Sequence, residues 1–216
     1  MNRRSGNMPR HGRDVRRRNR SRKPRYLVVC GGTVTERDYF TRLAKDHDLV
    51  IDVVAQVGSP RQLAEEAVRR KTDDARDTDA DPYRKAFVVV DVDEFHDHAQ
   101  AGRICNDNGI LLIISNPCFE VWLVDHLESC PESHSTTKMV EQRAASRSIT
   151  KGSRNKYIDF DVINGHLGDA LRNADRHNTP ERLKHRNVLT ANREQSYAPW
   201  TDMPQLIYAM GIRPEP

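Results

Sequence analysis

One stretch decides the fold: Ala86-Phe87-Val88-Val89-Val90-Asp91-Val92-Asp93-Glu94-Phe95. Its first five residues are all apolar, which is typical of a strand buried on both faces. The strand runs directly into Asp91 and Asp93, so these acids lie at its carboxyl end. In an open parallel sheet, ligands bind outside the carboxyl ends of the strands. The stretch therefore predicts both an α/β sheet and the edge of the sheet where a site would lie.

Other apolar runs extend this pattern in both directions along the chain. They predict strands at residues 26–30, 49–54, 86–90 and 110–114. Helices are predicted between them, at about residues 35–45, from Ser59-Pro60 onward and at about 97–106. After the fourth strand, Asn116 is predicted to be the N-cap of a further helix with Pro117 at its first position. Strands that alternate with helices imply parallel βαβ units.

The apolar density falls beyond about residue 132. Helices are expected there at residues 137–147, 160–176 and 203–210. The domain organisation that follows is a basic arm at 1–25, an α/β core at 26–130, and a helical C-terminal extension at 131–216 that packs on the core.

Composition narrows the class of protein. The chain has 216 residues, of which 37% are hydrophobic and 31% charged, a length that suits one α/β domain with appendages. We expect no membrane span, because no apolar stretch is long enough, and the N-terminus lacks the features of a secretory signal. The expected location is the cytoplasm. The four cysteines have neither zinc-site nor CxxC spacing, so packed, reduced thiols are expected.

Charge is distributed unevenly along the chain. Residues 1–25 carry eleven Lys/Arg against one acid, Asp14, a net charge of +10, whereas the overall charge is +4 and the remainder is therefore −6. An Arg-rich arm with few apolar residues is expected to be disordered alone and to neutralise phosphates. A solvated tail without a specific partner is the alternative. The arm nevertheless favours DNA or RNA as a partner.

The carboxylates after the third predicted strand suggest a metal site. Asp91 and Asp93 can point the same way and share a hard cation such as Mg²⁺ or Mn²⁺, which prefers oxygen ligands and suits phosphoryl chemistry. An acidic turn that is merely solvated is the alternative. His96 and His98 are expected at an exposed helix start rather than in a zinc site. A receiver-like phosphoacceptor is disfavoured, because Gly31-Gly32 supplies no acidic pair after the first strand.

Three ordered motifs resemble those of RloB-like proteins, whose opening motif is written apolar-C-E-G-x-x-T-E-x-x-Y-F and whose later motifs are DxDxF and S-N-P-x-F-E-x-W-L. The matching stretches are Leu27-Val28-Val29-Cys30-Gly31-Gly32-Thr33-Val34-Thr35-Glu36-Arg37-Asp38-Tyr39-Phe40, Val90-Asp91-Val92-Asp93-Glu94-Phe95 and Ser115-Asn116-Pro117-Cys118-Phe119-Glu120-Val121-Trp122-Leu123. The resemblance covers residues 26 to about 128 and is weaker beyond them.

The resemblance implies a Toprim-like fold and a metal-dependent endonuclease in phage defence, acting on DNA or RNA, tRNA among the candidates. It implies metal-binding roles for Glu36, Asp91 and Asp93. One departure stands out, since the first glutamate of the family falls at Gly31, which has no side chain. Either Glu36 or Glu120 substitutes for it, or the chain has lost cleavage and binds nucleic acid or a partner ATPase.

Both glutamates also have a structural interpretation. Glu36 and Glu120 are each expected in the first turn of a helix, where the helix dipole favours a carboxylate without any catalytic role. The basic residues Lys151, Arg154 and Lys156 are interpreted as a solvated loop rather than as phosphate contacts.

Overall fold

The computed structural model describes residues 23–77, 81–92, 95–186 and 197–213. Most of the basic arm, together with Asp93 and Glu94, lies outside the described residues. Within them, no helix is long and apolar enough to cross a membrane.

A five-stranded sheet forms the centre of the molecule, in the order β2-β1-β3-β4-β7. Its strands are β1 (Arg25–Cys30), β2 (Val50–Ala55), β3 (Lys85–Asp91), β4 (Leu111–Asn116) and β7 (Trp200–Thr201). The first four are parallel, and β7 pairs antiparallel with β4. The four predicted parallel strands are therefore confirmed, and the mainly parallel sheet is that of a Toprim-like α/β fold.

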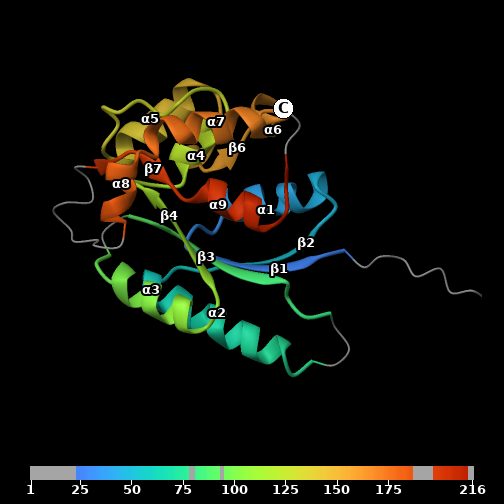
Figure 1. Cartoon of the computed structure of the whole chain (residues 1–216). Helices are drawn as coiled ribbons and strands as arrows, with labels where there is room; N and C mark the ends of the chain where they lie inside the picture. The colour runs from blue at the N-terminus through green and yellow to red at the C-terminus, as the bar shows by residue number, and fades with distance from the viewer. Residues whose placement is uncertain (1–22, 78–80, 93–94, 187–196, 214–216) are drawn as a thin grey trace, which may run out of the picture.

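Helices cover both faces of this sheet, as Figure 1 shows. On one face lie α2 (Pro60–Asp74) and α3 (His98–Asp107). On the other lie α1 (Thr35–Asp46), α4 (Glu120–Asp125) and α9 (Met203–Ala209). Side chains of the strands alternate between the two layers: Tyr26 and Val28 pack with the second group of helices, whereas Leu27 and Val29 pack with the first. Burial on both faces explains why these strands are continuous apolar runs.

The start of α2 follows directly from its sequence. The Ser59 side chain accepts a hydrogen bond from the Gln62 backbone amide, and the Gln62 side chain accepts one from the Ser59 amide. Pro60 occupies the first helical position, where no donor is lost. The predicted helix start at Ser59-Pro60 is confirmed.

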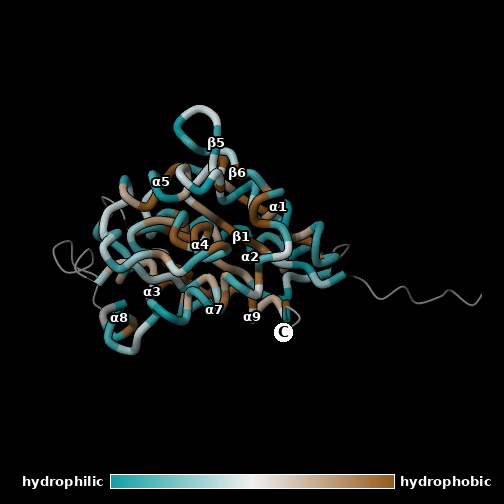
Figure 2. Tube along the Cα trace, turned by 90° about the horizontal axis from the view of Figure 1, so that it is seen from above, coloured by the Kyte–Doolittle hydropathy of each residue, from teal (hydrophilic) through white to brown (hydrophobic). Residues whose placement is uncertain are grey.

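The C-terminal part adds helices and two short strands to this core. Its elements are α5 (Thr137–Ser146), β5 (Thr150–Lys151), a 3₁₀ turn (Ser153–Asn155), β6 (Tyr157–Ile158), α6 (Phe160–Ile163), α7 (Leu167–His177) and α8 (Pro180–His185). The expected helix at 160–176 is thus two helices, separated at Gly165, whose φ of +80° suits glycine and interrupts a right-handed helix. Antiparallel β5 and β6 are joined by a loop that Figure 2 shows as a hydrophilic protrusion.

The C-terminal part shares its packing with the rest of the chain. The Tyr26 hydroxyl donates a hydrogen bond of 2.7 Å to the Met210 carbonyl, which connects β1 to the end of α9. The His177 Nε2 lies 2.9 Å from both carboxylate oxygens of Asp125, and both side chains are fully buried. Residues from both halves therefore contribute to one apolar layer.

The predicted cap at Asn116 is wrong. Asn116 is the last residue of β4 and is paired with Trp200 of β7, so its backbone is held extended by a strand far away in the sequence. The helix α4 begins only at Glu120, after Phe119 as its N-cap residue. Glu120 nevertheless lies in the first turn, as expected.

Candidate functional site

A hollow of about 500 Å³ lies at the carboxyl ends of β1, β3 and β4, and we call it the strand-end hollow. Three of the four carboxylates expected from the sequence line it, namely Glu36, Asp91 and Glu120, and we call these three the acid cluster. Asp93 lies outside the described residues. The parallel order of the strands brings these side chains together, because neighbouring parallel strands end at the same edge of the sheet.

Glu36 is held at this edge by the glycine pair after β1. It is buried in the first turn of α1, and the backbone amides of Gly32 and of Glu36 itself donate hydrogen bonds to its carboxylate. A Cβ atom at Gly32 would overlap this carboxylate. The second glycine is therefore required for the Glu36 side chain to fold back over the end of β1.

Burial raises the pKa of Glu36, and the negative charge of Glu120 raises it further, to about 7. The hydrogen bonds from the backbone amides and the charge of Lys156 act in the opposite direction. A carboxyl with this pKa holds a proton in about half of the molecules at neutral pH. Glu36 can therefore both accept and donate a proton under physiological conditions.

Lys156 brings a positive charge into the same space. Its Nζ lies 2.9 Å from Oε1 of Glu141, on α5, and 3.7 Å from Oε1 of Glu120. Burial lowers the pKa of Lys156, but Glu120, Glu141 and Glu36 raise it well above its usual range. The ammonium group therefore stays charged and partly balances the carboxylates.

Two buried cysteines lie among the carboxylates. The pKa of the Cys30 thiol is raised by burial and by the charges of Glu36 and Asp91. The pKa of Cys118 is raised by burial and by the charges of Glu120 and Asp91. Each thiol thus feels two members of the acid cluster, which places all three carboxylates in one electrostatic environment. All four cysteines are free and buried, as expected from their spacing.

His98 fixes the backbone of Asp91 from the face of the sheet that α2 and α3 cover. The Asp91 carbonyl lies 2.8 Å from Nε2 of His98, which must donate because a carbonyl only accepts. The expectation that His98 lies exposed is wrong, since the side chain is only 2% exposed. The first turn of α3 folds back under the end of β3, and this buries the ring.

The donor chemistry of the acid cluster suits a hard cation, which prefers carboxylate oxygens. Within the described part of the chain, however, no three His, Cys, Asp or Glu side chains converge closely enough to hold a metal ion. The described carboxylates are thus part of a possible ligand set, and Asp93 would have to complete it.

A protein-family model described as RloB-like protein matches residues 26–210. The chain belongs to the RloB-like family. No curated protein and no solved structure matches it. The match extends beyond the three motifs into the C-terminal elements, so it includes the β5–β6 hairpin and α9.

In this RloB-like chain, Gly31 stands at the position where the resemblance places the first glutamate of the opening motif. A Cβ atom there would meet only Cδ1 of Leu63, at an ordinary 3.7 Å. A side chain at this position is therefore not excluded by packing. Glu36, whose side chain folds over the neighbouring Gly32, is the carboxylate nearest to Gly31 along the sequence.

From the C-terminal part, sequence reasoning named Arg154 and Lys156 only as a solvated loop, and it missed Thr137 and Glu141 in the strand-end hollow of this RloB-like protein. Arg154, Lys156, Thr137 and Glu141 line it, although none follows a strand of the main sheet. Lys156 is half-buried and faces carboxylates, so its interpretation as part of a solvated loop is wrong. Lys151 pairs with Asp159 instead. The β5–β6 hairpin brings Arg154 and Lys156 to the acids, α5 brings Thr137 and Glu141, and no local pattern encodes either path.

Proposed function

We propose that this chain is a metal-dependent endonuclease that cleaves DNA or RNA. The observation that carries the proposal is the acid cluster: Glu36, Asp91 and Glu120 come from three strand ends and line one hollow together with Arg154 and Lys156. Carboxylates that bind a cation, beside basic side chains that bind phosphate, are what phosphodiester cleavage needs.

We assign Asp91 and Asp93 to the cation, Mg²⁺ or Mn²⁺. Such an ion, when bound, would neutralise charge on a phosphate oxygen and lower the pKa of a bound water. Burial and the charge of Glu120 raise the pKa of Glu36, and a nearby cation would favour its ionised form. Glu36 is itself the third candidate ligand, provided that it is ionised.

The remaining chemistry belongs to the side chains of the protein. With a pKa of about 7, Glu36 is suited to take a proton from a nucleophile or give one to a leaving group at neutral pH. It would thereby fill the role of the glutamate that Gly31 replaces. Glu120, which lies near Lys156, would orient that ammonium group rather than transfer protons.

The rim of the strand-end hollow suits a nucleic acid. Arg154 is exposed there and can meet a phosphate, and Phe95 and Val57 are apolar side chains exposed by 41% and 88%. An exposed aromatic ring is a stacking platform for a base. The Arg-rich arm would add salt-dependent attachment. The setting in phage defence and a partner ATPase are proposed on the family resemblance alone, and the cytoplasmic location is proposed from the sequence features described above.

The test is cleavage by the purified full chain on a panel of DNA, tRNA and other RNA, with Mg²⁺, Mn²⁺ or chelator. We expect metal-dependent cleavage that Asp91→Asn abolishes and that Glu36→Gln lowers by about 100-fold or more. Glu65→Gln, an identical chemical change on the exposed face of α2, is the matched control and should cleave normally. Cleavage that survives in chelator, or in Asp91→Asn, would exclude the metal mechanism.

A second function is favoured by one observation. Gly31 lacks the carboxylate of the family, and Lys156 already places a cation beside the remaining acids. The chain could therefore bind nucleic acid without cutting it. Binding without cleavage by the wild type, together with cleavage by Gly31→Glu but not by the uncharged Gly31→Gln, would establish this second function and reject the first.

A further inference from the structure

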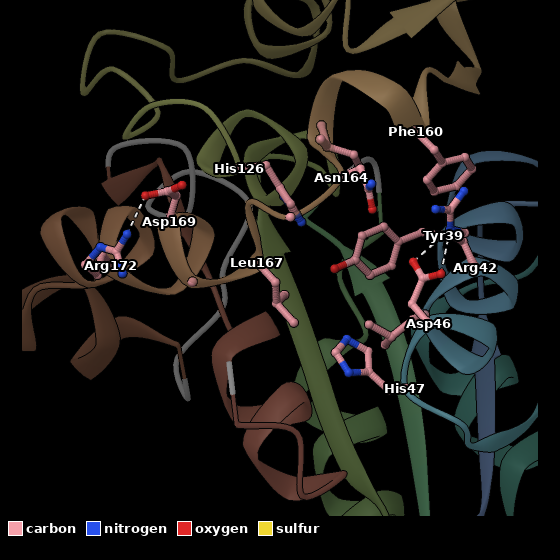
Figure 3. A pocket seen from close by; sticks show the side chains of 14 residues that line it. Tyr39, Arg42, Asp46, His47, His126, Phe160, Asn164, Leu167, Asp169 and Arg172 are labelled. Atoms are coloured by element: carbon pink, nitrogen blue, oxygen red, sulfur yellow. Dashed lines mark hydrogen bonds and ion pairs between the residues drawn. The ribbon is translucent and has the colours of Figure 1, made fainter. Parts of the chain in front are cut away.

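A second hollow, of about 470 Å³, lies between α1, α4, α6 and the start of α7. We call it the α1–α4 hollow, and Figure 3 shows it from close by. It shares no lining residue with the strand-end hollow. Nothing in the proposed nuclease mechanism uses its side chains, so its chemistry can be considered independently.

His126 presents a hydrogen-bond acceptor to this space. Its ring is 3% exposed, and Nδ1 lies 2.9 Å from the Trp122 carbonyl, to which it must donate. Burial lowers the pKa of His126 to about 4, so the ring is neutral at physiological pH and Nε2 carries a lone pair. No partner of Nε2 occurs within the described part of the chain, and Nε2 is not one of the fully buried polar atoms, so it keeps access to the hollow that His126 lines. An acceptor open to the hollow is available to the N–H group of a ligand in place of water.

Tyr39 presents a donor beside it. The Tyr39 hydroxyl accepts a hydrogen bond of 2.7 Å from Nε1 of Trp122, which leaves its own hydrogen available. No acceptor for that hydrogen occurs among the described residues. The ring centroids of Tyr39 and His126 are 5.8 Å apart, and Figure 3 shows the Tyr39 hydroxyl and the His126 ring directed toward the same space. Trp122 therefore fixes an acceptor and a donor side by side, one through its carbonyl and the other through its indole nitrogen.

The walls and rim indicate what else a ligand must satisfy. The walls include the apolar side chains of Leu43, Phe160 and Leu167, which suit a flat ring. At the rim, Arg42 pairs with Asp46, and Arg172 pairs with Asp169. Each guanidinium is already matched by a carboxylate, so neither ion pair offers an unmatched charge to a phosphate or an amine.

We propose that the α1–α4 hollow binds an uncharged heteroaromatic molecule of the nucleobase class. One N–H of the ligand donates to Nε2 of His126, and an adjacent ring nitrogen accepts from the Tyr39 hydroxyl, while the ring lies against the apolar walls. The inference rests on the geometry of this hollow and not on the nuclease activity.

The probes for the test share a purine ring and differ in the groups attached to it. 9-Methyladenine has an amino donor beside a ring acceptor, 9-methylpurine lacks the amino group, and adenosine monophosphate carries a ribose and a phosphate in place of the methyl group. We expect saturable binding of 9-methyladenine to the full chain by calorimetry. Binding of 9-methylpurine should be at least about tenfold weaker, because it leaves Nε2 of His126 unpaired. The monophosphate should also bind more weakly than 9-methyladenine.

The variants locate the binding. His126→Leu and Tyr39→Phe should each weaken 9-methyladenine at least about tenfold, whereas the exposed controls His96→Leu and Tyr157→Phe, and Asp91→Asn in the other hollow, should bind as the wild type does. In the wild type, the ¹⁵N resonance of the His126 Nε2 should move on binding as that atom accepts a hydrogen bond. This readout needs no substitution and decides the matter if His126→Leu does not fold. Absence of saturable binding, or binding that leaves Nε2 unmoved, would overturn the proposal.

Discussion

Replacing Glu36 with glutamine tests the electrostatics of the strand-end hollow through stability alone. Burial and the charge of Glu120 raise the pKa of Glu36 from an ordinary value near 4.5 to about 7 in the folded protein. Between these values the folded state binds more protons than the unfolded state, so wild-type stability falls as pH rises through this window. Above pH 7 the whole penalty is present, and below pH 4.5 it vanishes. The difference between the two pKa values corresponds to a loss of about 3 kcal/mol in the free energy of unfolding.

Glutamine cannot ionise, so Glu36→Gln escapes this penalty. We expect the variant to exceed the wild type in free energy of unfolding by about 3 kcal/mol at pH 8, and by less than about 1 kcal/mol at pH 5. At pH 8 this corresponds to a melting temperature higher by roughly 6–12 °C. The assay is thermal and urea unfolding at both pH values.

Glu65→Gln provides the control, because the Glu65 side chain is exposed and its pairing with Arg61 spans 3.7 Å. It should show no difference between the two pH values beyond a few tenths of a kcal/mol. If the stability advantage of Glu36→Gln were equal at pH 5 and pH 8, the Glu36 carboxyl would have an ordinary pKa. The reasoning about its proton transfer would then fail as well.

Three other tests probe the site and its support. Gly32→Ala should destabilise the fold or displace the Glu36 carboxylate, because a Cβ at position 32 would collide with it. Gly31→Ala should be tolerated, because a Cβ at position 31 makes only an ordinary contact. Equal urea midpoints for the two variants would contradict this. Mg²⁺ at about 100 times its dissociation constant should stabilise the wild type by roughly 2.7 kcal/mol, and Asp91→Asn with Asp93→Asn should remove the resulting melting shift; cleavage without any shift would refute the metal mechanism. His177→Ala should cost about 3–5 kcal/mol in urea unfolding, because it leaves its buried carboxylate partner uncompensated; a loss below about 1 kcal/mol would show that the pair is not ionic.

The central sheet could be predicted because its evidence is local. The runs at residues 26–30 and 86–90 are apolar throughout, since both faces of β1 and β3 are covered by helices. The acids at the end of β3 could be assigned to a site for the same reason, because a buried parallel strand determines which edge carries the ligands. Glu36 also follows from its place directly after β1.

Other features depend on contacts between distant residues and have no local signal. The strand β7 is only two residues long, and it exists because Thr201 and Trp200 pair with the end of β4. That pairing also explains the failed cap at Asn116, whose residue type favours a helix start in isolation. Lys156 reaches the acids through a hairpin whose two strands, β5 and β6, are only two residues long. From the sequence alone, Lys156 could not be distinguished from a residue of a solvated loop.

The order of elements along the chain has a consequence for synthesis on the ribosome. β4 is made long before its neighbour β7, so one edge of the growing sheet stays unpaired in the nascent polypeptide. Over the same interval, the helices that cover α4 have not yet been synthesised. Its Trp122 and Leu123, which are completely buried in the folded protein, are then left uncovered. An open strand edge beside an uncovered apolar helix invites association between chains. Translation through the C-terminal part is thus the period in which we expect association between nascent chains to be most favoured.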